Sequence, residues 1–159
     1  MGVCINNRCV PEGVVAVTAD KTKYKQGETV RVTVRNGLDR SVWYFGGCGS
    51  PQFWSLSKLE DNGWKGVDFF LPDLAEGREV CSVKLCERQE PWELKSGSTV
   101  EHDWRGSICE WPSEPTTGIP KIEPELIEEG TYRISFTYGL SKDEEGFGLL
   151  EERTVYSEF

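Results

Sequence analysis

The sequence predicts an all-β protein built from antiparallel strands, and three features support this expectation. Several short segments alternate between apolar and polar residues, the pattern of strands with one buried face. Turn residues such as Asn36-Gly37 and Asp61-Asn62-Gly63 separate these segments at short intervals. No stretch of about ten residues has the 3.6-residue periodicity of an amphipathic helix. Because antiparallel strands must bury their apolar faces, we expect a sandwich or a barrel.

In the first half of the chain, the expected strands are 14–18, 30–35, 41–45, 53–59 and 64–69. The run 14–18 is rich in β-forming residues, and the polar segment 20–28 after it ends in a turn signal. Val30, Val32 and Val34 alternate with polar residues, which predicts a half-buried strand. Segments 53–59 and 64–69 flank Asp61-Asn62-Gly63, whose residues tolerate positive φ and favour a tight hairpin.

In the second half, the expected strands are 99–105, 131–138 and 153–157. Segment 99–105 follows a turn at Leu94-Lys-Ser-Gly97 and puts Val100, His102 and Trp104 on one face. Segment 131–138 has four apolar residues on one face: Tyr132, Ile134, Phe136 and Tyr138. Two stretches without strand patterns, 71–90 and 111–126, are expected to be long loops, which in compact domains are commonly functional.

Length and charge limit the classes of protein. The 159 residues fit one domain, which we place at 14–159 after an N-terminal segment, 1–13. A net charge of −9 disfavours nucleic acids and anionic membrane surfaces as partners. No apolar run reaches about 18 residues, so we expect no membrane span. The abrupt start after Met1-Gly2 suggests that a leader is missing from this chain.

Six cysteines favour disulfides and an oxidising compartment. They are Cys4, Cys9, Cys48, Cys81, Cys86 and Cys109. Zinc is the competing interpretation, because Cys4 and Cys9 form one spaced pair and Cys81 and Cys86 another. The usual zinc knuckle has tighter spacing, so disulfides are favoured and no metal or other cofactor is expected.

The pairing of these cysteines is predicted only in part. Asn6-Asn7 can form a turn, which makes a local Cys4–Cys9 bridge geometrically easy. The expected hairpins return the 71–86 excursion to the neighbourhood of Cys48. We therefore expect Cys48 to pair with Cys81 or with Cys86, and the remaining one of these two to pair with Cys109.

One motif favours a sandwich over a barrel. Ile127-Glu-Glu-Gly130-Thr-Tyr132 precedes the alternating strand 131–138 and resembles a tyrosine corner. In immunoglobulin-like sandwiches, the hydroxyl of such a tyrosine bonds to the backbone a few residues upstream. The alternative is that Tyr132 is simply a core aromatic residue.

A wider resemblance covers about residues 14–138. Its motifs are Tyr24-x-x-Gly27-Glu-x-Val30, Asn36, Trp43-Tyr44, Cys48-Gly49, Gly63-Trp64, Leu94-Lys-Ser-Gly97 and Gly130-Thr-Tyr132-Arg-Ile-x-Phe136. Their order resembles small bacterial and archaeal immunoglobulin-like sandwich domains of secreted proteins or lipoproteins. The part from Leu94 to Trp104 is also similar to the bacterial intracellular proteinase inhibitor family, from which the six cysteines depart. The resemblance implies an antiparallel immunoglobulin-like β-sandwich, stapled here by disulfides.

For function, the first expectation is a non-catalytic, extracytoplasmic module that displays loops to a protein or glycan partner. The single histidine, His102, shares a face with Val100 and Trp104, which favours packing over catalysis. The alternative is a proteinase inhibitor that offers Lys84 from a disulfide-constrained loop. A third interpretation is a structural domain of a larger surface protein. Acidic runs such as 143–145 and 151–152 raise calcium binding as an alternative to a solvated surface.

Overall fold

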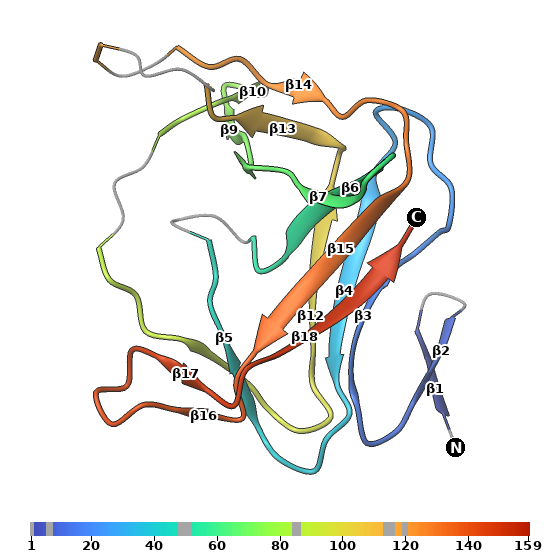
Figure 1. Cartoon of the computed structure of the whole chain (residues 1–159), viewed down its shortest axis with the longest axis vertical. Coiled ribbons are helices and arrows are strands. Elements are labelled where there is room, and N and C mark those ends of the chain that lie inside the picture. The colour runs from blue at the N-terminus through green and yellow to red at the C-terminus, as the bar shows by residue number, and fades with distance from the viewer. Residues whose placement is uncertain (1, 6–7, 48–51, 84–86, 113–116, 119–120) are drawn as a thin grey trace.

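The computed structural model describes residues 2–5, 8–47, 52–83, 87–112, 117–118 and 121–159. These residues contain no helix (Figure 1). All the strand pairs among them are antiparallel. The prediction of an all-β protein with antiparallel sheets is confirmed.

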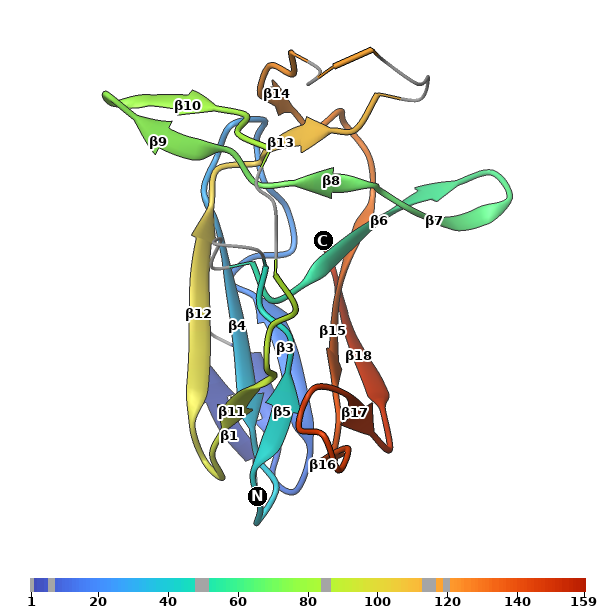
Figure 2. The same ribbon diagram turned by 90° about the vertical axis from the view of Figure 1, so that its left-hand side faces the viewer.

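Two sheets form the body of the molecule. The first has the order β12-β4-β3 and consists of β3 (Val15–Ala19), β4 (Val30–Asn36) and β12 (Thr99–Trp104). The second has the order β18-β15-β6-β7 and consists of β6 (Ser55–Glu60), β7 (Gly63–Gly66), β15 (Tyr132–Tyr138) and β18 (Arg153–Glu158). Figure 2 shows these sheets as two layers seen edge on, with β12 and β4 on one side and β15 and β18 on the other.

The hydrophobic core lies between the two layers, where the alternating residues of both sheets meet. Val32 and Val34 of β4 and Ile134 and Phe136 of β15 are completely buried, which confirms the buried faces predicted for 30–35 and 131–138. Burying each such side chain contributes about 1.5 to 3 kcal/mol to stability. Aromatic contacts join the layers: Trp54 lies 5.1 Å from Trp104 between ring centroids.

Shorter strands extend this body. They are β1 (Gly2–Ile5), β2 (Arg8–Pro11), β5 (Val42–Tyr44), β8 (Phe69–Phe70), β9 (Asp73–Ala75), β10 (Arg78–Val80), β11 (Trp92–Leu94), β13 (Ser107–Glu110), β14 (Glu125–Leu126), β16 (Ser141–Lys142) and β17 (Leu149–Leu150). Figure 2 shows β8, β9, β10, β13 and β14 together at one end of the molecule. At the other end, Trp43 of β5 and Gly139 exchange backbone hydrogen bonds of 3.0 and 2.8 Å. This bridge places β5 beside the end of β15.

The structure corrects three expectations about the chain's path. The expected loop 71–90 contains the hairpin β9–β10, whose turn residues Glu76 and Gly77 both have positive φ. The expected loop 111–126 ends in β14, which pairs with β13. The expected strand 64–69 is two strands, because β7 stops at Gly66 and β8 begins at Phe69 to pair with β13.

Asn36 connects three segments at the end of β4 and is completely buried. Its amide nitrogen donates to the carbonyls of Arg40 and Leu94 at 2.8 and 2.9 Å. Its amide oxygen accepts from the backbone N–H of Leu38 at 3.0 Å. Both ends of the buried amide are therefore satisfied, and the side chain replaces missing backbone pairs in this loop.

Candidate functional site

The N-terminal cysteines lie directly opposite each other in a hairpin. Cys4 of β1 and Cys9 of β2 are register partners and form a disulfide. The hairpin packs against the body, because Arg8 Nη1 donates to Ser157 Oγ of β18 at 3.2 Å and Val10 is buried. Residues 2–5 and 8–11 therefore form a disulfide-linked hairpin that contacts β18.

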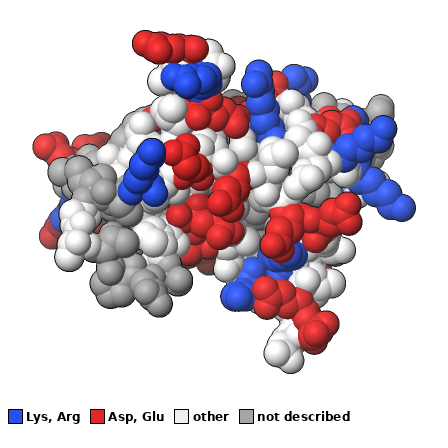
Figure 3. Space-filling view, turned by 90° about the horizontal axis from the view of Figure 1, so that it is seen from above, with Lys and Arg blue, Asp and Glu red and all other residues white. Residues whose placement is uncertain are grey.

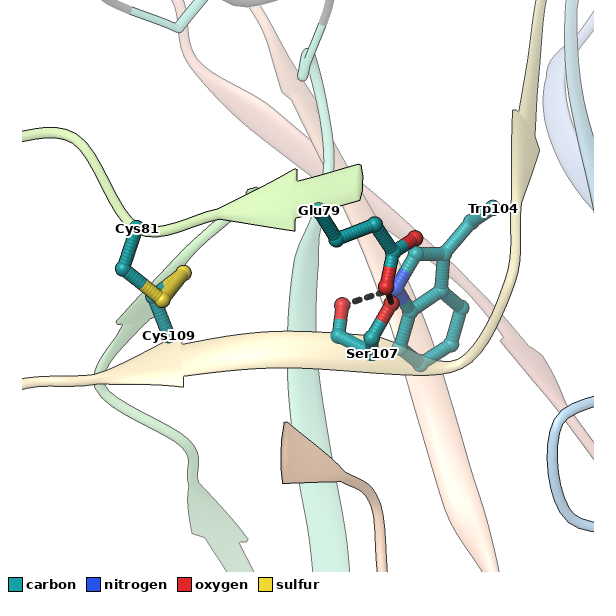
Figure 4. The surroundings of a disulfide bond; sticks show 5 residues. All are labelled: Glu79, Cys81, Trp104, Ser107 and Cys109. Atoms are coloured by element: carbon teal, nitrogen blue, oxygen red, sulfur yellow. Dashed lines mark hydrogen bonds between the residues drawn. A yellow bond between two sulfur atoms is a disulfide. The ribbon is translucent and has the colours of Figure 1, made fainter. Parts of the chain in front are cut away.

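A second disulfide joins Cys81, just after β10, to Cys109 of β13, with Cα atoms 5.7 Å apart (Figure 4). Nearby, the Ser107 hydroxyl donates to Glu79 at 2.7 Å and the Trp104 indole donates to the Ser107 carbonyl at 2.8 Å. These contacts hold the β9–β10 hairpin onto β13. The bridge excludes the alternative in which Cys48 pairs with Cys81. Cys48, Cys86 and Lys84 lie outside the described residues, so the rest of the pairing stays a prediction.

Tyr132 has the geometry of a tyrosine corner. Its ring is buried, and its hydroxyl donates to the carbonyl of Glu128, four residues upstream, at 2.9 Å. Burial raises the pKa of this hydroxyl, so it remains a donor at neutral pH. The contact ties the segment before β15 to the start of that strand.

His102 takes part in packing between the sheets. Its Nδ1 accepts a 3.0 Å hydrogen bond from the Trp54 indole, and its ring lies 6.4 Å from that of Phe53. Burial lowers the pKa of His102, which favours the neutral ring that this hydrogen bond requires.

Figure 3 shows acidic side chains gathered at the end of the molecule that carries β9, β10 and β13, whereas β16 and β17, which flank the acidic run 143–145, lie at the opposite end in Figure 1. In the C-terminal acidic run, Asp143 accepts a 2.9 Å hydrogen bond from the backbone N–H of Phe147, and Arg88 pairs with Glu145 at 3.4 Å. Backbone donors lower the pKa of Asp143. Among the residues that the structure describes, no three His, Cys, Asp or Glu side chains gather as metal ligands.

The most distinctive surface is the side of the second sheet that faces away from the core. We call it the outer sheet face and define it by the outward residues of β6, β7, β15 and β18: Ser55, Ser57, Leu59, Trp64, Arg133, Ser135, Thr137, Thr154, Tyr156 and Glu158. In Figure 1, β15 and β18 turn this face towards the viewer, with no other described strand in front of them.

Arg133 lies at the centre of a stack of side chains on the outer sheet face. Its guanidinium carbon is 4.4 Å from the ring centroid of Trp64 and 4.3 Å from that of Tyr156. The strand order places β18 on one side of β15 and β7 on the other, so the two rings reach Arg133 from opposite sides. Such contacts combine cation–π attraction with stacking of the planar guanidinium.

The rest of the outer sheet face joins exposed apolar surface to paired hydroxyl groups. Leu59 is 45% and Tyr156 is 53% exposed. Cross-strand hydroxyls bond each other, Ser55 to Ser135 at 3.1 Å and Thr137 to Thr154 at 2.8 Å. These hydroxyls satisfy one another, which leaves the exposed leucine, the two rings and Arg133 as the groups with unused binding capacity.

Concave regions adjoin the sheets, and aromatic side chains are among the residues that line them. A groove of about 770 Å³ at one end is lined by residues that include Tyr24, Tyr132 and Phe159, whose rings contact one another. A shallower hollow of about 420 Å³ lies between the outer sheet face and the chain before β6, and Phe45, Phe70 and Thr137 are among its lining residues.

The sequence expectations did not single out Arg133, Trp64 or Tyr156 as a group. The sequence does show that Arg133, Ser135 and Thr137 alternate with the buried side chains of β15, which places Arg133 on the outward side of the strand. Bringing Trp64 and Tyr156 to Arg133 also requires the strand order, which local patterns do not contain.

The described residues include no helix with the length and apolarity needed to cross a membrane. Comparisons with protein-family models, with curated proteins and with solved structures found no match for this chain.

Proposed function

We propose that this protein is a non-catalytic, extracytoplasmic binding module with an immunoglobulin-like sandwich fold, and that a protein partner docks on the outer sheet face. The observation that carries the proposal is the stack of Trp64, Arg133 and Tyr156 at the centre of an exposed sheet face. Trp, Tyr and Arg are the residue types most enriched where binding energy concentrates in protein interfaces.

The fold part of the proposal draws support from strand order. If β3, β4 and β12 correspond to strands A, B and E, then β6, β7, β15 and β18 correspond to C, C′, F and G of the facing sheet. The hydrogen bond from Tyr132 to Glu128, at the start of the strand in position F, fits the same fold.

The location part draws support from the two disulfides, Cys4–Cys9 and Cys81–Cys109, which are compatible with an oxidising compartment. The non-catalytic part draws support from His102, a half-buried side chain whose Nδ1 accepts a hydrogen bond from the Trp54 indole.

The test is capture of partners from the extracytoplasmic fraction of the native source, with the tagged protein as bait. The tagged protein is compared with a Leu59→Ser/Tyr156→Ser variant, which lacks two apolar side chains of the outer sheet face. A Leu74→Ser/Leu150→Ser variant is the matched control, because both leucines are exposed on strands outside this face. We expect a partner that wild type and control retain and the outer-face variant loses. Equal retention by all three baits would contradict the proposed surface.

Glycan binding is a second candidate, favoured by the hollow beside the outer sheet face. Phe45 is 42% exposed there, and Thr137, whose hydroxyl bonds that of Thr154, lines the same hollow. Aromatic rings pack against the apolar faces of sugars while hydroxyls bond their edges, so a glycan array tests this candidate. Binding that Phe45→Ala abolishes and Leu59→Ser/Tyr156→Ser preserves would favour the glycan over the protein partner.

The inhibitor alternative rests on Lys84, which the described residues do not include. Cys81 bonds Cys109, so the segment from Cys81 to Cys86 is not closed by a bridge between its own ends. Inhibitory activity stays a prediction that a panel of trypsin-like and subtilisin-like proteases tests at micromolar concentration.

A further inference from the structure

The Arg133 side chain is held in one orientation before any partner binds. The rings of Trp64 and Tyr156 lie 4.4 and 4.3 Å from its guanidinium carbon. Two rings at these distances, carried by strands on either side of β15, restrict the movement of the guanidinium. A guanidinium fixed in this way loses less side-chain entropy when it forms hydrogen bonds.

Among the described residues, Arg133 also has no hydrogen-bond or ion-pair partner for its side chain, and its Nε is buried without an acceptor. Two other cations on the sheets do bind carboxylates: Arg31 binds Asp103 in a bidentate contact at 2.7 and 3.0 Å, and Lys58 binds Glu128 at 2.6 Å. In a chain with 27 acidic and 18 basic residues, a positioned arginine without a carboxylate is an unsatisfied donor set that needs an explanation.

Neither cross-strand neighbour of Arg133 forms an ion pair with it among the described residues. Its register partner on β6 is Ser57, a small side chain. Its register partner on β18 is Glu158, which is exposed and makes no ion pair with it among the described contacts. Glu158 would repel an anionic ligand, so replacing it by a neutral residue tests whether the ligand is negatively charged.

From these observations we infer that Arg133 is the receptor for a carboxylate, and that the protein partner presents it on an acidic segment. The inference rests on the proposed function and deepens it, because it names the chemistry of the partner. The planar guanidinium matches a planar carboxylate through two parallel hydrogen bonds. The exposed Leu59 and Tyr156 flank this point on an open sheet, which suits an extended peptide better than a small molecule.

The experiment uses the full chain and two blocked peptides of equal length, one of glutamate and one of glutamine. Two-dimensional NMR follows the Arg133 Nε–H and the Trp64 indole N–H. We expect saturable shifts with the glutamate peptide at concentrations up to about 10 mM, weakened by salt, and none with the glutamine peptide. Arg133→Lys should lower affinity about tenfold, because an ammonium keeps the charge but loses the paired geometry.

Three further variants sharpen the result. Glu158→Gln should raise affinity for the glutamate peptide, because it removes a negative charge beside the site. Arg31→Lys is the matched control on the first sheet and should leave affinity unchanged. Arg133→Gln removes the charge altogether and should abolish the shifts of the Trp64 indole. Thermal unfolding of each variant shows whether its fold is intact.

The inference is overturned by equal binding of both peptides, by no saturable shift with the glutamate peptide, or by unchanged affinity in a folded Arg133→Lys variant. Binding of a glucuronate oligosaccharide in place of the peptide also overturns it, because the carboxylate would then come from a glycan. A partner that Leu59→Ser/Tyr156→Ser loses but Arg133→Lys retains would leave the proposed function standing and reject the carboxylate receptor.

Discussion

The hydroxyl groups of Tyr132 and Tyr156 have different roles in this protein. The Tyr132 hydroxyl donates to the Glu128 carbonyl from a buried ring, whereas Tyr156 is exposed and stacks on Arg133. The same chemical change at the two positions should therefore have different costs.

We predict that Tyr132→Phe lowers the free energy of unfolding by about 1 kcal/mol, the net contribution of a typical hydrogen bond. Tyr156→Phe keeps the ring on Arg133 and should change stability by less than about 0.5 kcal/mol. Urea denaturation of both variants measures the difference. Equal costs at the two positions would show that the Tyr132 hydroxyl does not hold the segment before β15.

His102 gives stability a pH dependence of defined sign. Burial lowers its pKa in the folded state below the ordinary value of 6.5, so the unfolded chain binds the proton more readily. The neutral ring's contribution is therefore complete above about pH 6.5 and is lost as pH falls through the lowered folded pKa. Lys58 lowers the pKa of Glu128 from its ordinary value of 4.5, and Arg31 lowers the pKa of Asp103 from 3.8. These carboxylates therefore change stability at a lower pH than His102 does.

We predict that the free energy of unfolding falls between about pH 6.5 and 5 in the wild type and stays nearly level there in His102→Gln. Glutamine can accept from the Trp54 indole and does not titrate. Denaturation at a series of pH values makes the comparison. An identical slope in both proteins would assign the dependence to other groups.

At the scale of single elements, Asn36 joins the end of β4 to the segments at Arg40 and Leu94. Asn36→Ala should lower the free energy of unfolding by about 3 kcal/mol, because it removes a hydrogen-bond partner from the Leu94 carbonyl, the Arg40 carbonyl and the Leu38 N–H. Asn62→Ala, in the exposed turn between β6 and β7, is the control and should cost less than about 0.5 kcal/mol. A small loss at Asn36 would mean that water replaces its amide.

The two disulfides should contribute unequally. Cys81–Cys109 spans 28 residues and fastens β10 to β13, whereas Cys4–Cys9 spans 5 residues within one hairpin. Replacing both Cys81 and Cys109 by serine should lower the free energy of unfolding by about 3 kcal/mol. Replacing both Cys4 and Cys9 should lower it less, because the entropy that a disulfide removes from the unfolded chain grows with loop length. Guanidinium denaturation of both double variants tests the order, and the reverse order would contradict it.

Local patterns predicted the strands that have one fully buried face. The alternation at 30–35 and 131–138 is visible in the sequence because each apolar side chain packs into the core. The hairpin β9–β10 was not predicted, because Leu74 is 70% exposed and its turn uses Glu76 in a positive-φ conformation that glutamate rarely adopts. The strand pair β16–β17 is only two residues long on each side, too short for a periodic signal.

The candidate site was predicted less well than the fold, for a physical reason. Arg133 could be placed on the outward side of its strand from alternation alone. Its contacts with Trp64 and Tyr156 depend on pairings between segments about 70 and 20 residues apart, and long-range pairing is set by the whole core rather than by local sequence. Function was expected in loops, whereas Arg133 and its two rings lie on a sheet.

At the scale of the whole molecule, the two layers assign different roles to their surfaces. The first sheet contributes an inner face and a surface on which Arg31 and Asp103 neutralise each other. The second sheet presents an unpaired, ring-held arginine between exposed apolar side chains. This asymmetry leads us to assign recognition to the second sheet.

Hydrogen exchange of the complex with the captured partner tests this assignment most directly. The binding-face account predicts added protection at 55–59, 63–66, 132–138 and 153–158, with little change at 30–36 and 99–104. Protection confined to the loops at either end of the sheets, with the second sheet unchanged, would contradict it.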